Sequence, residues 1–187
     1  RKNAGGGLLR DPDAVHRLLL GASVGMRVAR PPKFRLEVCV KGMDLRSITQ
    51  PILVGQYEQD PIAGPQALID RDMLHGDLTE RYNLGIYAGP IGTAVAVLSA
   101  VDETGRRRRQ LGGAIVTGLG KYDGSLSPGT LADAVRTGVL RYLLQVADVL
   151  GEEPREVALA TLLIGYNSAA NLTVDASVEA LVRGVVE

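Results

Sequence analysis

The amino-acid sequence predicts an α/β domain with a mixed, mostly parallel sheet. Three observations predict this fold class: apolar segments of strand length recur along the chain, amphipathic helical segments separate them, and one pair of apolar segments is joined by a short turn. Strands separated by helices pair in parallel, whereas a hairpin adds an antiparallel pair. Because the chain has 187 residues, of which 45% are hydrophobic, it can bury one core of this kind.

The start of the chain is predicted to lie outside this domain. Its glycine-rich opening is typical of a linker, and an Asp-Pro pair then favours a short helix over residues 11–22. Pro31 and Pro32 cannot continue a helix, because proline lacks the amide hydrogen. The sequence therefore predicts a linker with a short helix over residues 1–33 and the α/β domain over residues 34–187.

Five regions are predicted to contribute strands. The first alternates apolar and polar residues, which indicates a strand covered on one face, and the second is uniformly apolar, which indicates a strand covered on both faces. The third contains a Gly-Pro-Ile-Gly turn and is predicted to fold into a hairpin. In order, the regions are residues 35–43, 51–57, 84–98, 112–119 and 157–164.

Four helices are predicted to accompany these strands, over residues 65–74, 78–82, 128–150 and 173–187. The third of them begins where a serine can cap the helix and a proline fits its first turn. Its apolar residues recur at intervals of three and four, as expected of one packed face. They are Leu131, Val135, Val139, Leu140, Leu143, Leu144 and Val146.

The charge balance does not favour nucleic acid or a membrane as a partner. Lys plus Arg and Asp plus Glu both number 21, so the chain carries no net charge that would attract either. No apolar run approaches the roughly 18 residues that span a bilayer. Arg106–Arg109 are interpreted as the solvated tip of a hairpin, with contact to an acidic partner or a phosphate backbone as the alternative.

The single cysteine, Cys39, favours a reducing, cytoplasmic location. It falls in the first predicted strand, where a partly buried and unreactive thiol is expected. The chain begins at Arg1 without a methionine and ends just after a helical pattern, so we expect it to be a piece of a longer protein.

A glycine-rich turn is the first candidate site. Gly118, Gly120, Lys121 and Gly124 lie between an apolar strand and a helix start, where free backbone amides bind phosphate groups. The spacing does not match a P-loop, because no Ser or Thr follows the Gly-Lys pair, and the third glycine comes one place late for the dinucleotide pattern. A tight turn without a ligand is the first interpretation, and an anion or nucleotide phosphate site is the alternative.

A second candidate site surrounds a histidine. Asp70, Asp72, His75, Asp77 and Glu80 are close in sequence, and helical spacing brings His75 alongside Asp72. The first interpretation is a solvated helix end, and the alternative is a site for a hard metal or for acid–base chemistry. We expect no metal and no cofactor.

Two segments resemble a known family. They read ILVGQYEQDPIAGPQALIDRDMLHGDLTERYNLG and GGAIVTGLGKYDGSLSPGTLADAVRTGVLRYL. The order of a strand, a GLGK turn, and a serine or threonine followed by a helix is similar to that in the N-terminal, macro-like domain of the leucyl aminopeptidase family. The segments PILVGQYEQDPIAGPQ, LGIYAGPIGTA and GGAIVTGLG resemble more closely the version of this domain associated with large bacterial proteins that carry caspase-like CHAT modules.

The resemblance implies a three-layer, macro-like domain with helices on both faces of the sheet, beside an effector domain. The peptidase chemistry of the aminopeptidases belongs to another domain, whose acid-rich metal-binding segment is absent here. We therefore expect a non-catalytic interaction domain of a larger bacterial effector-type protein. Its expected partners are other domains of that protein or other proteins, and a homo-oligomer is left open.

Two other functions are weighed against this one. The first is a sensor that binds a nucleotide or an ADP-ribose-type ligand at the carboxyl ends of the strands, near Gly55 to Gly64 and Gly118 to Gly124. The partner would then be a small, phosphate-bearing molecule. The second is a hydrolase that uses His75 with Asp72 or Asp77.

Overall fold

The computed structural model describes residues 35–101, 107–150 and 156–187. The chain divides into two compact units, Arg1–Val38 and Cys39–Glu187. The described residues of the first unit form neither a helix nor a strand, and the linker and short helix predicted at the start of the chain lie outside the described residues. All the elements discussed below belong to the second unit.

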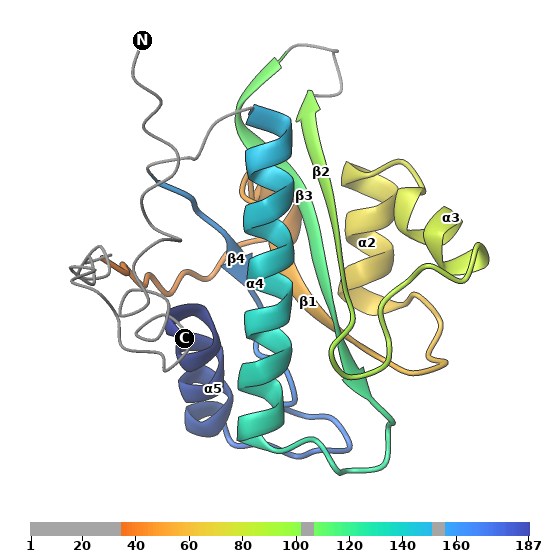
Figure 1. The fold of residues 1–187 in the computed structure, drawn as a ribbon, viewed down its shortest axis with the longest axis vertical. Helices are drawn as coiled ribbons and strands as arrows, with labels where there is room; N and C mark the ends of the chain where they lie inside the picture. The colour runs from red at the N-terminus through yellow and green to blue at the C-terminus, as the bar shows by residue number, and fades with distance from the viewer. Residues whose placement is uncertain (1–34, 102–106, 151–155) are drawn as a thin grey trace, which may run out of the picture. The chain divides into compact units, whose positions relative to one another are not determined.

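The second unit contains a four-stranded mixed sheet with the strand order β2-β3-β1-β4 (Figure 1). β1 is parallel to both β3 and β4, and β2 is antiparallel to β3, which confirms the predicted mixed and mostly parallel sheet. The elements are η1 (Leu45–Ser47), β1 (Ile52–Tyr57), α2 (Gly64–Met73), α3 (Asp77–Asn83), β2 (Ala94–Val101), β3 (Arg107–Gly120), α4 (Pro128–Leu150), β4 (Ala160–Thr161) and α5 (Val174–Val186).

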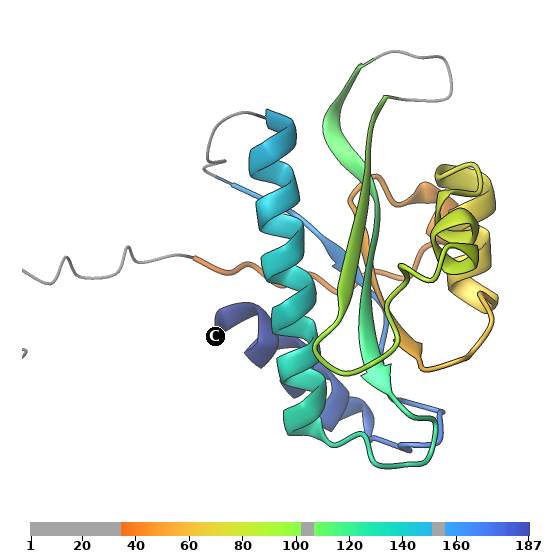
Figure 2. The same cartoon turned by 45° about the vertical axis from the view of Figure 1, so that its right-hand side comes forward.

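Helices cover both faces of the sheet, which confirms the three-layer α/β class. α4 and α5 lie on one face, and α2 and α3 lie on the other (Figure 2). Successive side chains of β1 point to opposite faces. Leu53 packs in the buried cluster that includes α4 and α5, whereas Ile52 and Val54 pack in the cluster that includes α2 and α3. β1 is thus buried on both faces, as its uniformly apolar sequence predicts.

The helices begin close to the predicted positions because their caps form. The Ser127 hydroxyl accepts a hydrogen bond from the backbone amide of Thr130 at 3.1 Å, and the Thr173 hydroxyl accepts one from the amide of Ala176 at 3.2 Å. The predicted packed face of α4 is only partly correct. Leu140 and Leu144 are 56% and 63% exposed, because the apolar stripe of α4 is wider than the surface that the sheet and α5 cover.

The strand predicted over residues 35–43 is wrong. This segment has no strand partner among the described residues, and Val38 and Val40 are exposed. Cys39 is exposed as well, so the partly buried thiol expected in the middle of a strand is also wrong. Alternating hydrophobicity makes a segment suited to a sheet, but a strand forms only where another strand satisfies its backbone hydrogen bonds.

The hairpin predicted within residues 84–98 is wrong in its position. Residues 84–93 form a loop, and the antiparallel pair is β2 with β3, in which Ala94 lies opposite Thr117. Arg107–Arg109 belong to β3, so the prediction that they lie in a turn is wrong, whereas Arg106 lies outside the described residues. Arg107 pairs with Val101 of β2, and the register of the pairing shifts between Val101 and Ser99.

The last predicted strand is much shorter than expected. β4 contains only Ala160 and Thr161, which pair with Ile52 and Leu53 of β1. The chain then leaves the sheet and turns at Gly165, whose φ of +79° lies in the left-handed region.

Candidate functional site

The glycine-rich turn lies at the edge of the sheet where the parallel strands β1 and β3 end. The connection after β1 leads to α2 and α3 on one face, whereas the connection after β3 leads to α4 on the other face (Figure 1). Neighbouring strands whose connections leave in opposite directions form the position at which open α/β sheets commonly bind ligands. The predicted location of a ligand site is thus a reasonable one for this fold.

The loop over residues 89–93 covers this edge of the sheet and binds it through backbone hydrogen bonds. The backbone amide of Gly118 donates to the carbonyl oxygen of Thr93 at 2.9 Å, and the amide of Gly120 donates to the carbonyl oxygen of Gly89 at 2.8 Å. A Cβ atom on Gly118 would collide with the carbonyl oxygen of Pro90. Gly118 is therefore required for the close approach of this loop, and two amides that a phosphate would need are already used by the backbone.

The turn is exposed from Lys121 to Ser125. Gly120 and Gly124 have φ angles of +77° and +82°, a conformation that glycine adopts without strain. Asp123 accepts a hydrogen bond from the amide of Ser125 at 2.9 Å. Ser125 lowers the pKa of Asp123 through its side chain first and its backbone second. Lys121 is exposed, and no hydrogen bond from the amides of residues 121–124 to another described residue is found.

Two tyrosines hold the turn against the neighbouring loops. The rings of Tyr57 and Tyr122 meet edge to face, with their centroids 4.9 Å apart. The Tyr57 hydroxyl lies 3.2 Å from the hydroxyl of Ser168, which belongs to the loop after β4. The three loops that follow β1, β3 and β4 are therefore linked through one side chain.

Gly55 and Gly64 each have a structural role. Gly55 lies within β1, where a Cβ atom would press against Leu119 and Ile164, and its carbonyl oxygen accepts a hydrogen bond from the Gln66 side chain at 2.7 Å. Gly64 is the first residue of α2, with a φ of +53° and open space around it. The geometry thus explains Gly55 by packing and Gly64 by backbone conformation.

Asp70 is buried, so the interpretation of this residue as part of a solvated helix end is wrong. Its carboxylate accepts hydrogen bonds from the amide of Leu78 at 2.8 Å, from the amide of Thr79 at 3.1 Å and from the hydroxyl of Thr79 at 2.5 Å. These amides belong to the first turn of α3, which otherwise has no side-chain cap at Gly76. Asp70 of α2 therefore caps the next helix.

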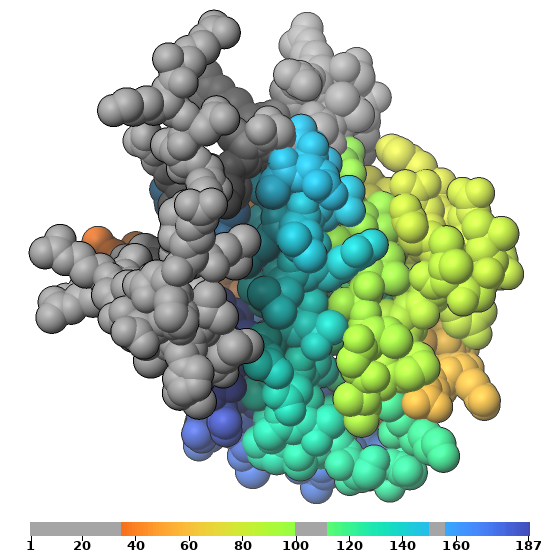
Figure 3. Space-filling view, viewed as in Figure 1, coloured from red at the N-terminus to blue at the C-terminus, as the bar shows by residue number. Residues whose placement is uncertain are grey.

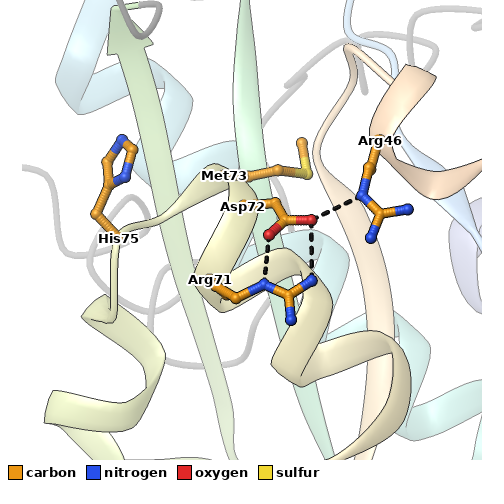
Figure 4. Close-up of a pocket in the computed structure, with 5 residues that line it drawn as sticks. All are labelled: Arg46, Arg71, Asp72, Met73 and His75. Atoms are coloured by element: carbon orange, nitrogen blue, oxygen red, sulfur yellow. Dashed lines mark hydrogen bonds and ion pairs between the residues drawn. The ribbon is translucent and has the colours of Figure 1, made fainter.

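Asp72 is paired with two arginines on the surface of α2 (Figure 4). Its carboxylate lies 2.6 Å from the Arg71 guanidinium and 2.8 Å from that of Arg46, which belongs to η1. The hydrogen bond from Arg71, followed by that from Arg46, lowers the pKa of Asp72 to about 2. The Asp72 carboxylate thus stays ionised and holds η1 to α2.

His75 does not pair with either aspartate. α2 ends at Met73, and His75 has a φ of +55°, so its side chain leaves the helix on a different side from Asp72 (Figure 4). It lines an open hollow of about 360 Å³ together with Arg46, Arg71, Asp72 and Met73. Within the described ranges, no hydrogen bond joins His75 to Asp72 or Asp77, and no three His, Cys, Asp or Glu side chains gather as a metal site would require.

The sequence did not reveal the contacts that cover the carboxyl edge of the sheet, which is the edge where β1 and β3 end. Thr93 donates its hydroxyl hydrogen to the carbonyl of Pro90 at 2.6 Å and accepts a hydrogen bond from the amide of Gly89 at 3.1 Å. These bonds tighten the loop that covers Gly118. The only signal in the sequence is the Gly-Pro-Ile-Gly turn followed by threonine, which is equally typical of a hairpin.

The fold and the site define the chain as a three-layer α/β domain whose sheet edge is closed by its own loop. In comparisons with known proteins, no family model matches the chain, and no curated protein matches it. Among the helices that the structure describes, none is long and apolar enough to cross a membrane.

Proposed function

We propose that this chain is a non-catalytic interaction domain of a larger bacterial effector-type protein, of the macro-like kind found at the N-terminus of leucyl aminopeptidases and beside CHAT modules. The observation that carries the proposal is the closed carboxyl edge, where the amides of Gly118 and Gly120 bind backbone carbonyls of the chain itself. Asp70 and Asp72, the two aspartates of α2 before His75, also have structural partners. In this proposal the domain acts through its outer surface, and it resides in the cytoplasm.

Exposed apolar side chains supply a surface for such contacts. Large exposed apolar side chains occur in the loop before β2 and on α4. Leu84, Ile86 and Ile91 are each more than half exposed in that loop. Exposed apolar side chains that lie together mark surfaces for contact with other protein, and these three belong to one loop.

Hydrogen exchange in the longer protein tests the proposal directly. We expect the amides of the loop before β2 and of α4 to exchange more slowly when the neighbouring domains are present than in the 187-residue chain alone. The purified chain should not turn over peptide, ester or nucleotide substrates. Unchanged exchange throughout the chain, or turnover that a single substitution abolishes, would contradict the proposal.

A ligand-binding sensor is the second candidate, and the exposed amides of residues 121–124 favour it. A ligand present at about 100 times its dissociation constant would stabilise the fold by about 2.7 kcal/mol, which a thermal unfolding screen detects. We expect no shift with ADP-ribose, ATP, NAD or cyclic nucleotides. A shift that Lys121→Ala removes would favour the sensor instead.

A further inference from the structure

β2 forms one edge of the sheet and has an unusual composition for an edge strand. It is the terminal strand of the order β2-β3-β1-β4, and no described segment is found paired with its outer side. Its sequence, AVAVLSAV, contains neither a charged residue nor a proline. Exposed edges are normally protected by such residues because an unprotected edge pairs with further strands.

The pairing with β3 determines which backbone groups of β2 face outward. The bond from the Gly118 amide to the Thr93 carbonyl makes these two residues a hydrogen-bonded pair, and such pairs recur at every second residue of an antiparallel ladder. Val95 and Val97 therefore direct their backbone groups toward β3. Ala94, Ala96 and Leu98, which alternate with them, direct their amides and carbonyls away from it.

We propose that this edge binds β2 of a second copy of the chain in an antiparallel pair. The inference rests on the proposed role as an interaction domain and names a partner for it. With Ala96 opposite its own copy and Ala94 opposite Leu98 of the other chain, each facing pair exchanges two hydrogen bonds. The contact is self-complementary, as a two-fold axis requires. The balanced charge of the chain does not oppose it.

The outer side of α4 extends the surface beyond the strand. Val135 contacts α5 at Gly184, and Leu144 follows Val135 by nine positions, about two and a half helical turns, so it lies on the side of α4 away from α5. α4 packs over β2 and β3, and its outer side is at the surface beside the green segment that contains β2 (Figure 3). Leu144 is 63% exposed there.

The outer side of α4 adds buried area to the contact between the two strands. A strand edge alone buries less than the ~1,200 Å² of a stable protein interface. A two-fold axis beside β2 brings the outer sides of both α4 helices together over the joined sheet. A dimer with this axis therefore covers the apolar outer side of α4. It also provides hydrogen-bond partners for the outward backbone amides and carbonyls of β2.

Light scattering after size-exclusion chromatography tests the inference on the whole chain. We expect a mass twice that of one chain. Ala96→Pro removes an outward amide hydrogen while it leaves the bonds to β3 in place, so it should raise the dissociation constant of the dimer by about tenfold or more. Ala96→Ser keeps the amide and is the matched control, which should remain dimeric.

A second variant does not depend on the strand. Leu144→Glu changes an exposed side chain and should leave the thermal unfolding of the monomer unchanged, but it places a charge on the side of α4 that the dimer covers and should raise the dissociation constant of the dimer. Val178→Glu changes a side chain of α5 that is 42% exposed and should leave the dimer intact.

Three results would overturn the inference. The first is a wild-type chain that stays monomeric at every concentration, and the second is a dimer that neither Ala96→Pro nor Leu144→Glu weakens while both remain folded. The third is a monomer whose β2 amides become protected only when a different protein or peptide is added. None of these results contradicts the proposed function, which fails only if the longer protein leaves the exchange of the chain unchanged or if the chain is an enzyme.

Discussion

Asp70 and Asp72 lie two positions apart in α2, yet their carboxylates stabilise the fold in different ways. Asp70 is buried and binds two backbone amides and one hydroxyl of α3. Asp72 lies at the surface between two guanidinium groups. Neither carboxylate is left free for acid–base chemistry, so the sequence proximity of these residues to His75 reflects the junction of two helices.

The cap formed by Asp70 can be removed without changing the packing of α2. Asp70→Ala leaves the amides of Leu78 and Thr79 without an acceptor, so we expect the free energy of unfolding to fall by about 1–3 kcal/mol. Urea unfolding measures this change. Asp77→Ala alters an exposed residue in the first turn of α3 and should change stability by only about 0.5 kcal/mol. Equal effects of the two variants would contradict the assignment of the cap.

The ion pairs of Asp72 predict a dependence of stability on pH. Since the pKa of Asp72 is about 2 in the folded protein and about 3.9 in an unfolded chain, ionised Asp72 stabilises the fold above pH ~4, and this contribution disappears as the pH falls through about 2. The midpoint of thermal unfolding of Asp72→Asn should therefore lie below that of the wild type at neutral pH and approach it near pH ~2. Arg46→Gln should show a smaller part of the same effect. A difference that persists unchanged at acid pH would contradict this account.

At the scale of elements, the contact between the loop over residues 89–93 and the end of β3 closes the sheet edge. It depends on the absence of a side chain at Gly118, because a Cβ atom there would meet the carbonyl of Pro90. The loop and the strand are held by backbone bonds from Gly118 and Gly120. This junction is therefore more sensitive to added volume than its exposed neighbours are.

Substitution of two glycines distinguishes this contact from a general effect of backbone stiffening. Gly118→Ala should lower the free energy of unfolding by about 1–3 kcal/mol, because the loop must move away from β3. Gly129 lies in the first turn of α4, where an added Cβ would make only an ordinary contact with Ser127 Oγ at 3.8 Å. Gly129→Ala should therefore leave stability unchanged or raise it by up to about 1 kcal/mol. Chemical denaturation of both variants measures the difference. A Gly118→Ala protein as stable as the wild type would show that the loop does not pack as described.

The elements with strong local patterns could be predicted from the sequence. The uniformly apolar residues of β1, the serine and proline before α4 and the threonine before α5 each determine a local conformation, and the structure has these elements close to their predicted bounds. The strand pattern of residues 35–43 was misleading, since it says nothing about a partner. Strand pairing is decided by segments distant in sequence, which no local pattern contains.

The position of the candidate site could be predicted from the sequence, but the contacts that cover it could not. Parallel strands that end together place Gly118–Gly124 at the edge where ligands commonly bind, and the sequence was sufficient for that inference. The cover over this edge comes from the loop around Pro90, and the cap on α3 comes from a carboxylate in the preceding helix. Both depend on how separate elements approach each other in three dimensions, so spacing along the chain does not reveal them.

At the scale of the whole molecule, the two edge strands of the sheet, β2 and β4, differ in length. β2 is eight residues long, whereas β4 has only two, after which the chain turns away. The outer side of β2 therefore offers many more backbone donors and acceptors to a strand of another chain than the outer side of β4 does. In the proposed dimer both β2 edges are paired and only the short β4 edges remain, so further growth by strand addition is disfavoured.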